Sequence, residues 1–235
     1  MIGVDFDKIE FEMLGMQLLE PMALITDSIL GVMGVFFAYK ISKIKSPLLF
    51  YKYWKIFFLL FGVGAFLGGL GHTFYNQWSF YGKIPSWLFG PISIYFAEKA
   101  MISSHWDKRK KVLFNKISDS KLIMTYVAWA LILFFGNKEK ISTQPFLPIA
   151  INTILGMLTF VGFLGFKYTE KFSVKFKFFW SGVLVMLPTA FIFILKINAH
   201  QWFDKNDMSH IIMMIGITYF YLGVIKMSEG LKQKN

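Results

Sequence analysis

The chain contains no cysteine in its 235 residues. This absence excludes disulfide bonds, thiolate nucleophiles and cysteine-ligated metals, so any metal would need histidine, carboxylate or carbonyl ligands. A basic N-terminal segment is also lacking, because residues 1–12 carry the acids Asp5, Asp7, Glu10 and Glu12. We therefore expect no N-terminal signal peptide. We find no internal sequence repeat.

Apolar residues dominate the composition, with 55% hydrophobic and 19% aromatic residues and a mean hydropathy of +0.51. A soluble domain could not easily bury that much apolar surface. Several apolar runs of about 20 residues match the ~30 Å hydrocarbon core of a bilayer. We predict an all-α integral membrane protein with one domain, residues 1–235, formed by a seven-transmembrane helix bundle after a short acidic segment, 1–17. The predicted spans are 18–39, 54–77, 84–104, 121–136, 146–166, 176–196 and 207–227.

Basic residues are distributed unevenly between the two ends of these spans. Of the 25 Lys and Arg residues, 18 follow the first, third and fifth spans or lie at the C-terminus, and six lie on the other side. This bias predicts an N-terminus outside and a cytoplasmic C-terminus, in a bacterial-type inner or plasma membrane. We interpret HWDKRKKVLFNK, residues 105–116, as a cytoplasmic anchor for anionic lipid headgroups and not as a nucleic-acid site.

Ionisable side chains inside the predicted spans are few, and such residues usually mark a function or a pairing. We interpret Glu98 and Lys99, toward the inner end of the third span, as structural. The others are predicted to gather in the outer half of the membrane, although they come from the first, second and seventh spans. This convergence is the main functional signal in the sequence, and its members at comparable depth are Glu20, His72, Asn206, Asp207 and His210, with Asp27 lying deeper.

Some of these residues also have a simpler interpretation. Asp207 lies at the expected start of the seventh helix, where the helix dipole stabilises an acid. Asp27 lies about 10 Å deeper than Glu20. It is expected to be protonated or paired, either in a hydrogen bond to a neighbouring helix or as a proton acceptor. His72 lies in the glycine-rich stretch GVGAFLGGLGHTFY, which allows close helix packing and predicts a partner or ligand for the histidine.

The arrangement resembles the CREST-type seven-transmembrane hydrolase superfamily, which contains alkaline ceramidases, progestin and adiponectin receptors and lipid-remodelling proteins of GPI anchors. That family combines an acid near span one, Ser-x3-His in span two and His-x3-His at the start of span seven. His72 and His210 occupy two of the histidine positions, and Glu20 stands where the acid is expected. The run HIIMMIGITYFYLG resembles the segment that follows the last histidine.

The sequence departs from the family pattern at three places. Gly68 replaces the serine of Ser-x3-His, and Asn206 replaces the first histidine of His-x3-His. The family also keeps an aspartate at the start of span three, where this chain has Lys83 and Ser86.

The resemblance implies a zinc ion whose bound water attacks a lipid amide or ester. His72 and His210 would be two ligands, and Asp207, or alternatively Glu20, would be the third, which leaves one position for water. Asn206 would hydrogen-bond one of these ligands and help to orient it. The zinc would lower the pKa of its water toward ~7, and Glu20 or Asp27 would be the catalytic carboxylate that takes the proton. The acidic stretch DFDKIEFE, residues 5–12, resembles the calcium-binding segment of the ceramidases and implies calcium there.

Three functions follow as alternatives. The first is a zinc-dependent membrane hydrolase that acts on a lipid amide or ester from the outer leaflet. The second is a non-catalytic seven-helix protein that binds a lipid or another ligand with a degenerate metal site. The third is a small proton-coupled transporter, although the ionisable groups lie in the outer half only and we find no inverted repeat.

Overall fold

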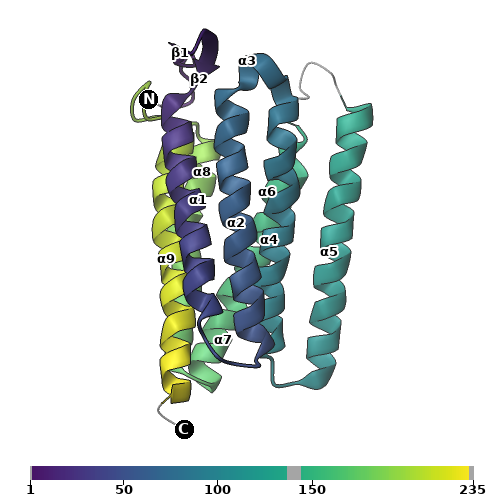
Figure 1. Cartoon of the computed structure of the whole chain (residues 1–235). Helices are drawn as coiled ribbons and strands as arrows, with labels where there is room; N and C mark the ends of the chain where they lie inside the picture. Colours follow the sequence, from purple (N-terminus) through teal and green to yellow (C-terminus); the bar gives the residue numbers. More distant parts are fainter. Residues whose placement is uncertain (1, 137–143, 233–235) are drawn as a thin grey trace.

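The computed structural model describes residues 2–136 and 144–232. Long helices run side by side in alternating directions, and the two ends of the chain lie at opposite ends of the bundle (Figure 1). One of these long helical segments, which we call the rod, consists of α6, the π-helical segment η3 and α7 in succession. The long elements are α1 (Pro21–Ser42), α2 (Leu49–Thr73), α4 (Ile84–Ser103), α5 (Lys108–Phe135), α6 (Phe146–Gly156), η3 (Met157–Phe163), α7 (Leu164–Lys171), α8 (Lys177–Ile194) and α9 (Lys205–Lys232).

Short elements connect or precede these helices. Strands β1 (Glu10–Met13) and β2 (Met16–Leu19) form an antiparallel hairpin that covers the end of the bundle where α1 begins. A short helix α3 (Tyr75–Trp78) and a 3-10 turn η1 (Ser79–Lys83) lead from α2 to α4 at the same end. The 3-10 turn η4 (Val174–Phe176) precedes α8. We call the end with the β1–β2 hairpin the hairpin end.

Within residues 2–136 and 144–232, six helices are long and apolar enough to cross a membrane, so the chain is a multi-pass membrane protein. The remaining long helix, α4, is the most enclosed of the bundle, since ten of its 20 residues are buried. Its packing against α2 and α5 places it inside the same bundle as the six. The six are Pro21–Ser42, Leu49–Thr73, Lys108–Phe135, Phe146–Lys171, Val174–Ile194 and Lys205–Glu229.

Several predicted boundaries were wrong. The first helix begins at Pro21 and not at 18, because Met16–Leu19 pairs with Glu10–Met13. The fourth span begins at Lys108 and not at 121, so most of the basic stretch lies in α5 and not in a loop. Asp107 starts that helix by accepting hydrogen bonds from the backbone N–H groups of Arg109 and Lys110 at 2.8 and 3.1 Å. Such an N-cap, followed by residues of good helix propensity, is sufficient to extend the helix.

Glycines bring α1 and α2 into close contact. A Cβ atom built on Gly34 of α1 would lie 2.6 Å from the Cα of Gly62 in α2, and one on Gly69 would lie 2.8 Å from the Cβ of Asp27. No larger side chain fits at these points, so the backbones approach as closely as small residues allow. The glycine-rich stretch that precedes His72 therefore sets the position of α2 against α1.

Aromatic side chains fill the half of the bundle away from the hairpin end. Trp54 of α2, Phe179 of α8 and Phe220 of α9 are fully buried. The ring centroid of Trp54 lies 5.0 Å from that of Phe179 and 5.5 Å from that of Phe220. Aromatic pairs at this separation stabilise a core beyond their buried area. This core leaves the polar side chains of α1, α2 and α9 at the hairpin end.

A second polar group, the inner cluster, joins α4, α5 and α6. Glu98 of α4 is fully buried, lies 2.7 Å from the Nζ of Lys121, and accepts a hydrogen bond from Ser118 at 2.5 Å. Lys99 pairs with Asp119 at 2.6 Å. Because only two of the 28 residues of α5 are buried, these ion pairs hold a helix that has little apolar contact with the bundle. The cluster comprises Glu98, Lys99, Ser118, Asp119, Lys121 and Asn152.

Two positions in the rod α6–η3–α7 face α4. A side chain at Gly156, at the end of α6, would collide with the carboxylate of Glu98. Tyr168 in α7 is fully buried and donates its hydroxyl hydrogen bond to the carbonyl of Met101 at 3.0 Å. The π-helical segment η3 lies between these two contacts.

Candidate functional site

The residues predicted to converge do come together at the hairpin end. We call this group the outer cluster. Its members come from the start of α1, the last turn of α2 and the first turns of α9, as predicted. The structure adds a threonine that sequence reasoning missed. The outer cluster comprises Glu20, Thr26, Asp27, His72, Asp207 and His210.

Glu20 joins the first and second helices. It precedes α1 with a left-handed backbone, φ 48°, which lets the chain turn from β2 into the helix. Its carboxylate lies 2.8 Å from Nδ1 of His72 and forms an ion pair with Lys8. Burial raises the pKa of Glu20, but the hydrogen bond from His72 and the charges of His72 and Lys8 outweigh burial and lower the pKa to about 2. Glu20 is therefore a carboxylate held between two basic groups.

His210 joins α9 to α1. Its Nδ1 lies 2.7 Å from the hydroxyl of Thr26, and its Nε2 lies 3.4 Å from Oδ1 of Asp27. Thr26 and Asp27 are adjacent in α1 and both are buried. The two ring nitrogens of His210 are thus directed at a hydroxyl and a carboxylate of the neighbouring helix.

Thr26 contacts both His210 and Asp207. Its hydroxyl has one proton and lies within hydrogen-bond distance of His210, of Asp207 Oδ1 at 3.1 Å and of the Met22 carbonyl at 3.0 Å. A threonine inside a helix usually bonds to its own preceding carbonyls, so nothing in the amino-acid pattern singles out Thr26. Only its contact with α9 reveals that it belongs to the site.

Asp207 turns inward. Its side chain is buried and accepts hydrogen bonds from Thr26 and, at 3.2 Å, from the backbone N–H of Asp204. The helix α9 begins at Lys205, so Asp207 lies in its first turn. Asp204 instead caps the helix, since its carboxylate accepts from the backbone N–H and the side-chain amide of Asn206 at 2.7 and 3.1 Å. Asn206 therefore binds Asp204 and is not seen to bind His72 or His210.

Gly68 and Ser86 lie beside Asp27. A Cβ atom at Gly68 would be 3.6 Å from Oδ2 of Asp27 and 3.6 Å from the Cβ of Ser86, which is ordinary contact distance. The hydroxyl of Ser86 donates to the carbonyl of Lys83 at 2.9 Å. Burial lowers the pKa of Lys83, although the charge of Glu20 opposes that shift. A methyl group at position 68 would therefore fit between Asp27 and the start of α4.

The predicted zinc ligands do not present free atoms to a common point. Nδ1 of His72 faces Glu20, both ring nitrogens of His210 face α1, and both oxygens of Asp207 accept hydrogen bonds. Within residues 2–136 and 144–232 there is no group of three or more His, Asp or Glu side chains arranged to hold a metal ion. In these orientations His72, His210, Asp207 and Glu20 do not form a zinc site. The zinc site stays a prediction.

The acidic N-terminal segment is engaged with lysines. Asp5 lies 2.9 Å from the Nζ of Lys196 and also forms an ion pair with Lys205. The hydrogen bonds from these two lysines lower the pKa of Asp5 to about 2. The predicted calcium site in residues 5–12 stays a prediction.

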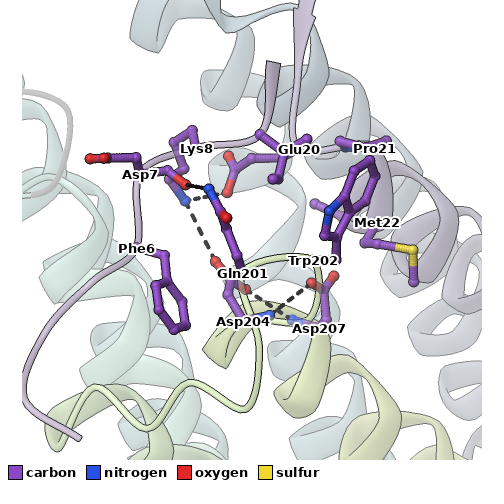
Figure 2. A pocket seen from close by; sticks show the side chains of 12 residues that line it. Phe6, Asp7, Lys8, Glu20, Pro21, Met22, Gln201, Trp202, Asp204 and Asp207 are labelled. Atoms are coloured by element: carbon purple, nitrogen blue, oxygen red, sulfur yellow. Dashed lines mark hydrogen bonds and ion pairs between the residues drawn. The ribbon is translucent and has the colours of Figure 1, made fainter. Parts of the chain in front are cut away.

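One hollow has residues of the outer cluster in its lining, and another lies further along α1 and α9. The first is a cavity of about 20 Å³ above α1, with Lys8, Glu20, Asp204 and Asp207 in its lining (Figure 2), which is room for about one water molecule. The second is a groove of about 250 Å³ between α1 and α9. It is lined by Met33, Met214, Ile215, Thr218, Tyr219 and Leu222.

Comparison with known proteins assigns a family but no activity. A family model described as "Family of unknown function (DUF6962)" matches residues 22–229, so the chain belongs to that family. A search of the curated proteins found no match. A search of the solved structures found no match either.

Proposed function

We propose that this protein binds a membrane lipid at its hairpin end, with the polar part of the lipid at the outer cluster and an acyl chain in the groove between α1 and α9. The observation that carries this proposal is that the outer cluster and the groove lie in succession along the same two helices, α1 and α9. His210 precedes Met214 by one turn of α9, and Asp27 precedes Met33 on α1. The headgroup of a lipid would therefore contact the polar outer cluster, and its acyl chain would lie in the apolar groove below.

The groove is open to the surrounding membrane. Ile215 and Leu222, in its lining, have 48% and 36% of their surface exposed. A groove with an apolar lining and an open side accepts a flexible hydrocarbon chain by dispersion contacts. Ligand sites of this kind pair a mostly apolar wall with a few placed polar groups, and the outer cluster supplies those groups.

The outer cluster suits the polar part of an amide or ester lipid. Thr26 and His210 carry hydrogen-bond donors and acceptors, while Asp27 and Asp207 carry acceptors. Ionisable residues at membrane depth are expensive unless they are paired or have a function. In the described part of the chain neither Asp27 nor Asp207 has a Lys or Arg partner at ion-pair distance, so no lysine or arginine neutralises these carboxylates, and they could exchange internal hydrogen bonds for bonds to a ligand.

The proposal includes a topology. The chain crosses the membrane seven times, α4 included, with the hairpin end outside and the C-terminus in the cytoplasm. The enclosed position of α4 and the distribution of lysines support this orientation. The basic start of α5 lies at the end of the bundle opposite the hairpin (Figure 1), where anionic lipid headgroups of the inner leaflet would contact it.

A matched pair of substitutions on α1 tests the lipid site. Met33→Trp places a large ring in the groove, whereas Val32→Trp places the same ring on a position that is 70% exposed on the outside of the bundle. We expect purified wild type and Val32→Trp to retain a lipid through detergent washing, measured by native mass spectrometry. Met33→Trp should lower its occupancy at least about tenfold, equivalent to ~1.4 kcal/mol. Equal retention by the two variants would contradict the site.

Hydrolysis of the bound lipid is the second candidate function, and one observation favours it. Nδ1 of His72 is held at 2.8 Å by the carboxylate of Glu20, which is the way a carboxylate orients a histidine that acts as a general base. The Nε2 side of the ring would then take a proton from a water molecule that attacks an ester or amide. Release of fatty acid from labelled ester and amide lipids by wild type, and its loss in His72→Gln, would establish this activity; equal release by both would exclude His72 as the base.

A further inference from the structure

The N-terminal segment 2–9 crosses the hairpin end and is bound to the loop between α8 and α9. We call this segment the strap. Gly3 donates its N–H to the carbonyl of Leu195 at 3.0 Å, and Asn198 donates to the carbonyl of Val4 at 2.8 Å. The other end of the strap is fixed by the N–H of Glu20, which donates to the carbonyl of Ile9 at 2.9 Å. The strap therefore spans from α8 and α9 to the start of α1.

Charged side chains fasten the strap at two points. Asp5 binds Lys196 and Lys205, as described above. Three residues later Lys8 forms an ion pair with Glu20 and lies 3.6 Å from Oδ2 of Asp204. Figure 2 shows Lys8 reaching between these two carboxylates. Because Glu20 and Asp204 belong to the starts of α1 and α9, Lys8 bridges the two helices that border the groove.

Lys8 and the rest of the strap lie over the small cavity at the mouth of the outer cluster. Phe6, Asp7, Lys8 and Ile9 form its upper wall, and Ala23 of α1 is buried at 3% exposure in its lower wall. With a volume of about 20 Å³, the cavity admits no lipid headgroup while the strap is in place. Movement of the strap would widen this cavity toward the outside.

We propose that the strap is a lid over the outer cluster, that Lys8 is its latch, and that a primary ammonium group of the ligand displaces Lys8. The reason for a cation is charge balance. The side chains of Glu20 and Asp204 are only 11% and 18% exposed, so removal of Lys8 without a replacement leaves Glu20 with His72 and takes from Asp204 its lysine. A ligand that carries an ammonium group restores the pairing that opening breaks. This inference rests on the proposed lipid binding for the identity of the ligand, but the lid itself does not.

The absence of cysteine in the natural sequence permits a direct test of the lid. A single Ala23→Cys reporter in the cavity wall is reacted in the full chain with a membrane-impermeant maleimide, and Tyr81→Cys, at a position that is 66% exposed at the same end, reports full access. We expect slow labelling at Ala23→Cys, several-fold faster labelling when Lys8→Gln is added, and slow labelling when Lys8→Arg is added. Met22→Cys, also in the cavity lining, replaces the reporter if Ala23→Cys does not fold. Labelling that is already as fast as at Tyr81→Cys, or that is equal in Lys8→Gln and Lys8→Arg, would overturn the lid.

The ligand is tested with the same reporter and Lys8 intact. Protein is reconstituted in vesicles of phosphatidylglycerol alone or mixed with phosphatidylethanolamine, which adds a primary ammonium headgroup. We expect faster labelling only with phosphatidylethanolamine. Acceleration by free ethanolamine in detergent as well would assign the site to the amine itself, and acceleration by the lipid alone would assign it to the headgroup on its chains. No acceleration by either would overturn the ammonium ligand. Failure of the lid leaves the Met33→Trp result unaffected, so the two proposals fail separately.

Discussion

The outer and inner clusters both bury charged side chains between helices, yet their charges are balanced in different ways. In the inner cluster each carboxylate faces a lysine, Glu98 with Lys121 and Asp119 with Lys99. In the outer cluster Asp27 and Asp207 face a histidine and a threonine. The inner cluster is complete without a ligand and holds α5. The outer cluster keeps polar capacity that a ligand can use.

The largest effect is expected from breaking the inner cluster. Lys121→Met leaves the fully buried Glu98 without its lysine, and removal of one partner of a buried ion pair costs about 3–5 kcal/mol. We expect a loss of folding stability of this size in thermal unfolding of the detergent-solubilised protein. The double variant Glu98→Leu with Lys121→Met should recover much of the loss, because it removes both charges. A double variant as unstable as the single one would show that the pair is not what holds α5.

An intermediate effect is expected where α2 contacts Asp27. Gly69→Ala forces a methyl group to within 2.8 Å of the Cβ of Asp27, whereas Gly68→Ala meets its nearest neighbours at 3.6 Å. Overpacking of this kind costs about 1–3 kcal/mol. We expect Gly69→Ala to lose stability in this range and to disturb lipid retention. Gly68→Ala is the matched control and should be close to wild type in both measurements; a reversed order would show that the helices pack in another register.

The smallest effect is expected from the strap. Since the pKa of Asp5 is lowered to about 2 from an ordinary value of 3.8, its ion pairs with Lys196 and Lys205 stabilise the protein above pH 3.8. That contribution is lost as the pH falls toward 2. Asp5 is 41% exposed, so the contribution is below about 1 kcal/mol. Asp5→Asn should therefore lower the unfolding temperature slightly at pH 6 and not at pH 2. Asp7→Asn, in the same segment, should have no effect at either pH.

The sequence predicted the helical bundle and the convergence of the outer cluster, but not the partners within it. Apolar runs locate helices, and helix direction gives depth, so Glu20, His72 and His210 could be placed at one level. Which side chain each of them faces depends on the rotation of the helices, and that is set by packing such as Gly34 against Gly62. Thr26 was missed for this reason.

The inner cluster was missed because of a boundary. With the fourth span predicted to begin at 121, Lys121 was placed at the membrane surface and Ser118 and Asp119 in a loop. The structure continues the helix back to Lys108, and the side chains that appeared to be solvated then face α4. Hydropathy alone does not predict that a helix extends into a run of lysines, because the residues that stabilise this extension lie on another helix, α4.

The π-helical segment η3 has a consequence for the phase of the rod that contains it. Gly156 and Tyr168 are separated by 12 positions, and on a regular α-helix they would point about 120° apart. Hydrogen bonds from i to i+5 take up about one extra residue, which brings the angle near 20° and turns both positions toward α4. The π-helical segment thus accommodates one extra residue and keeps Gly156 and Tyr168 on the same side of the helix. Deletion of one residue between 157 and 163 would leave a regular helix with 11 positions between the two residues, about 20° apart, and Tyr168 would still face Met101.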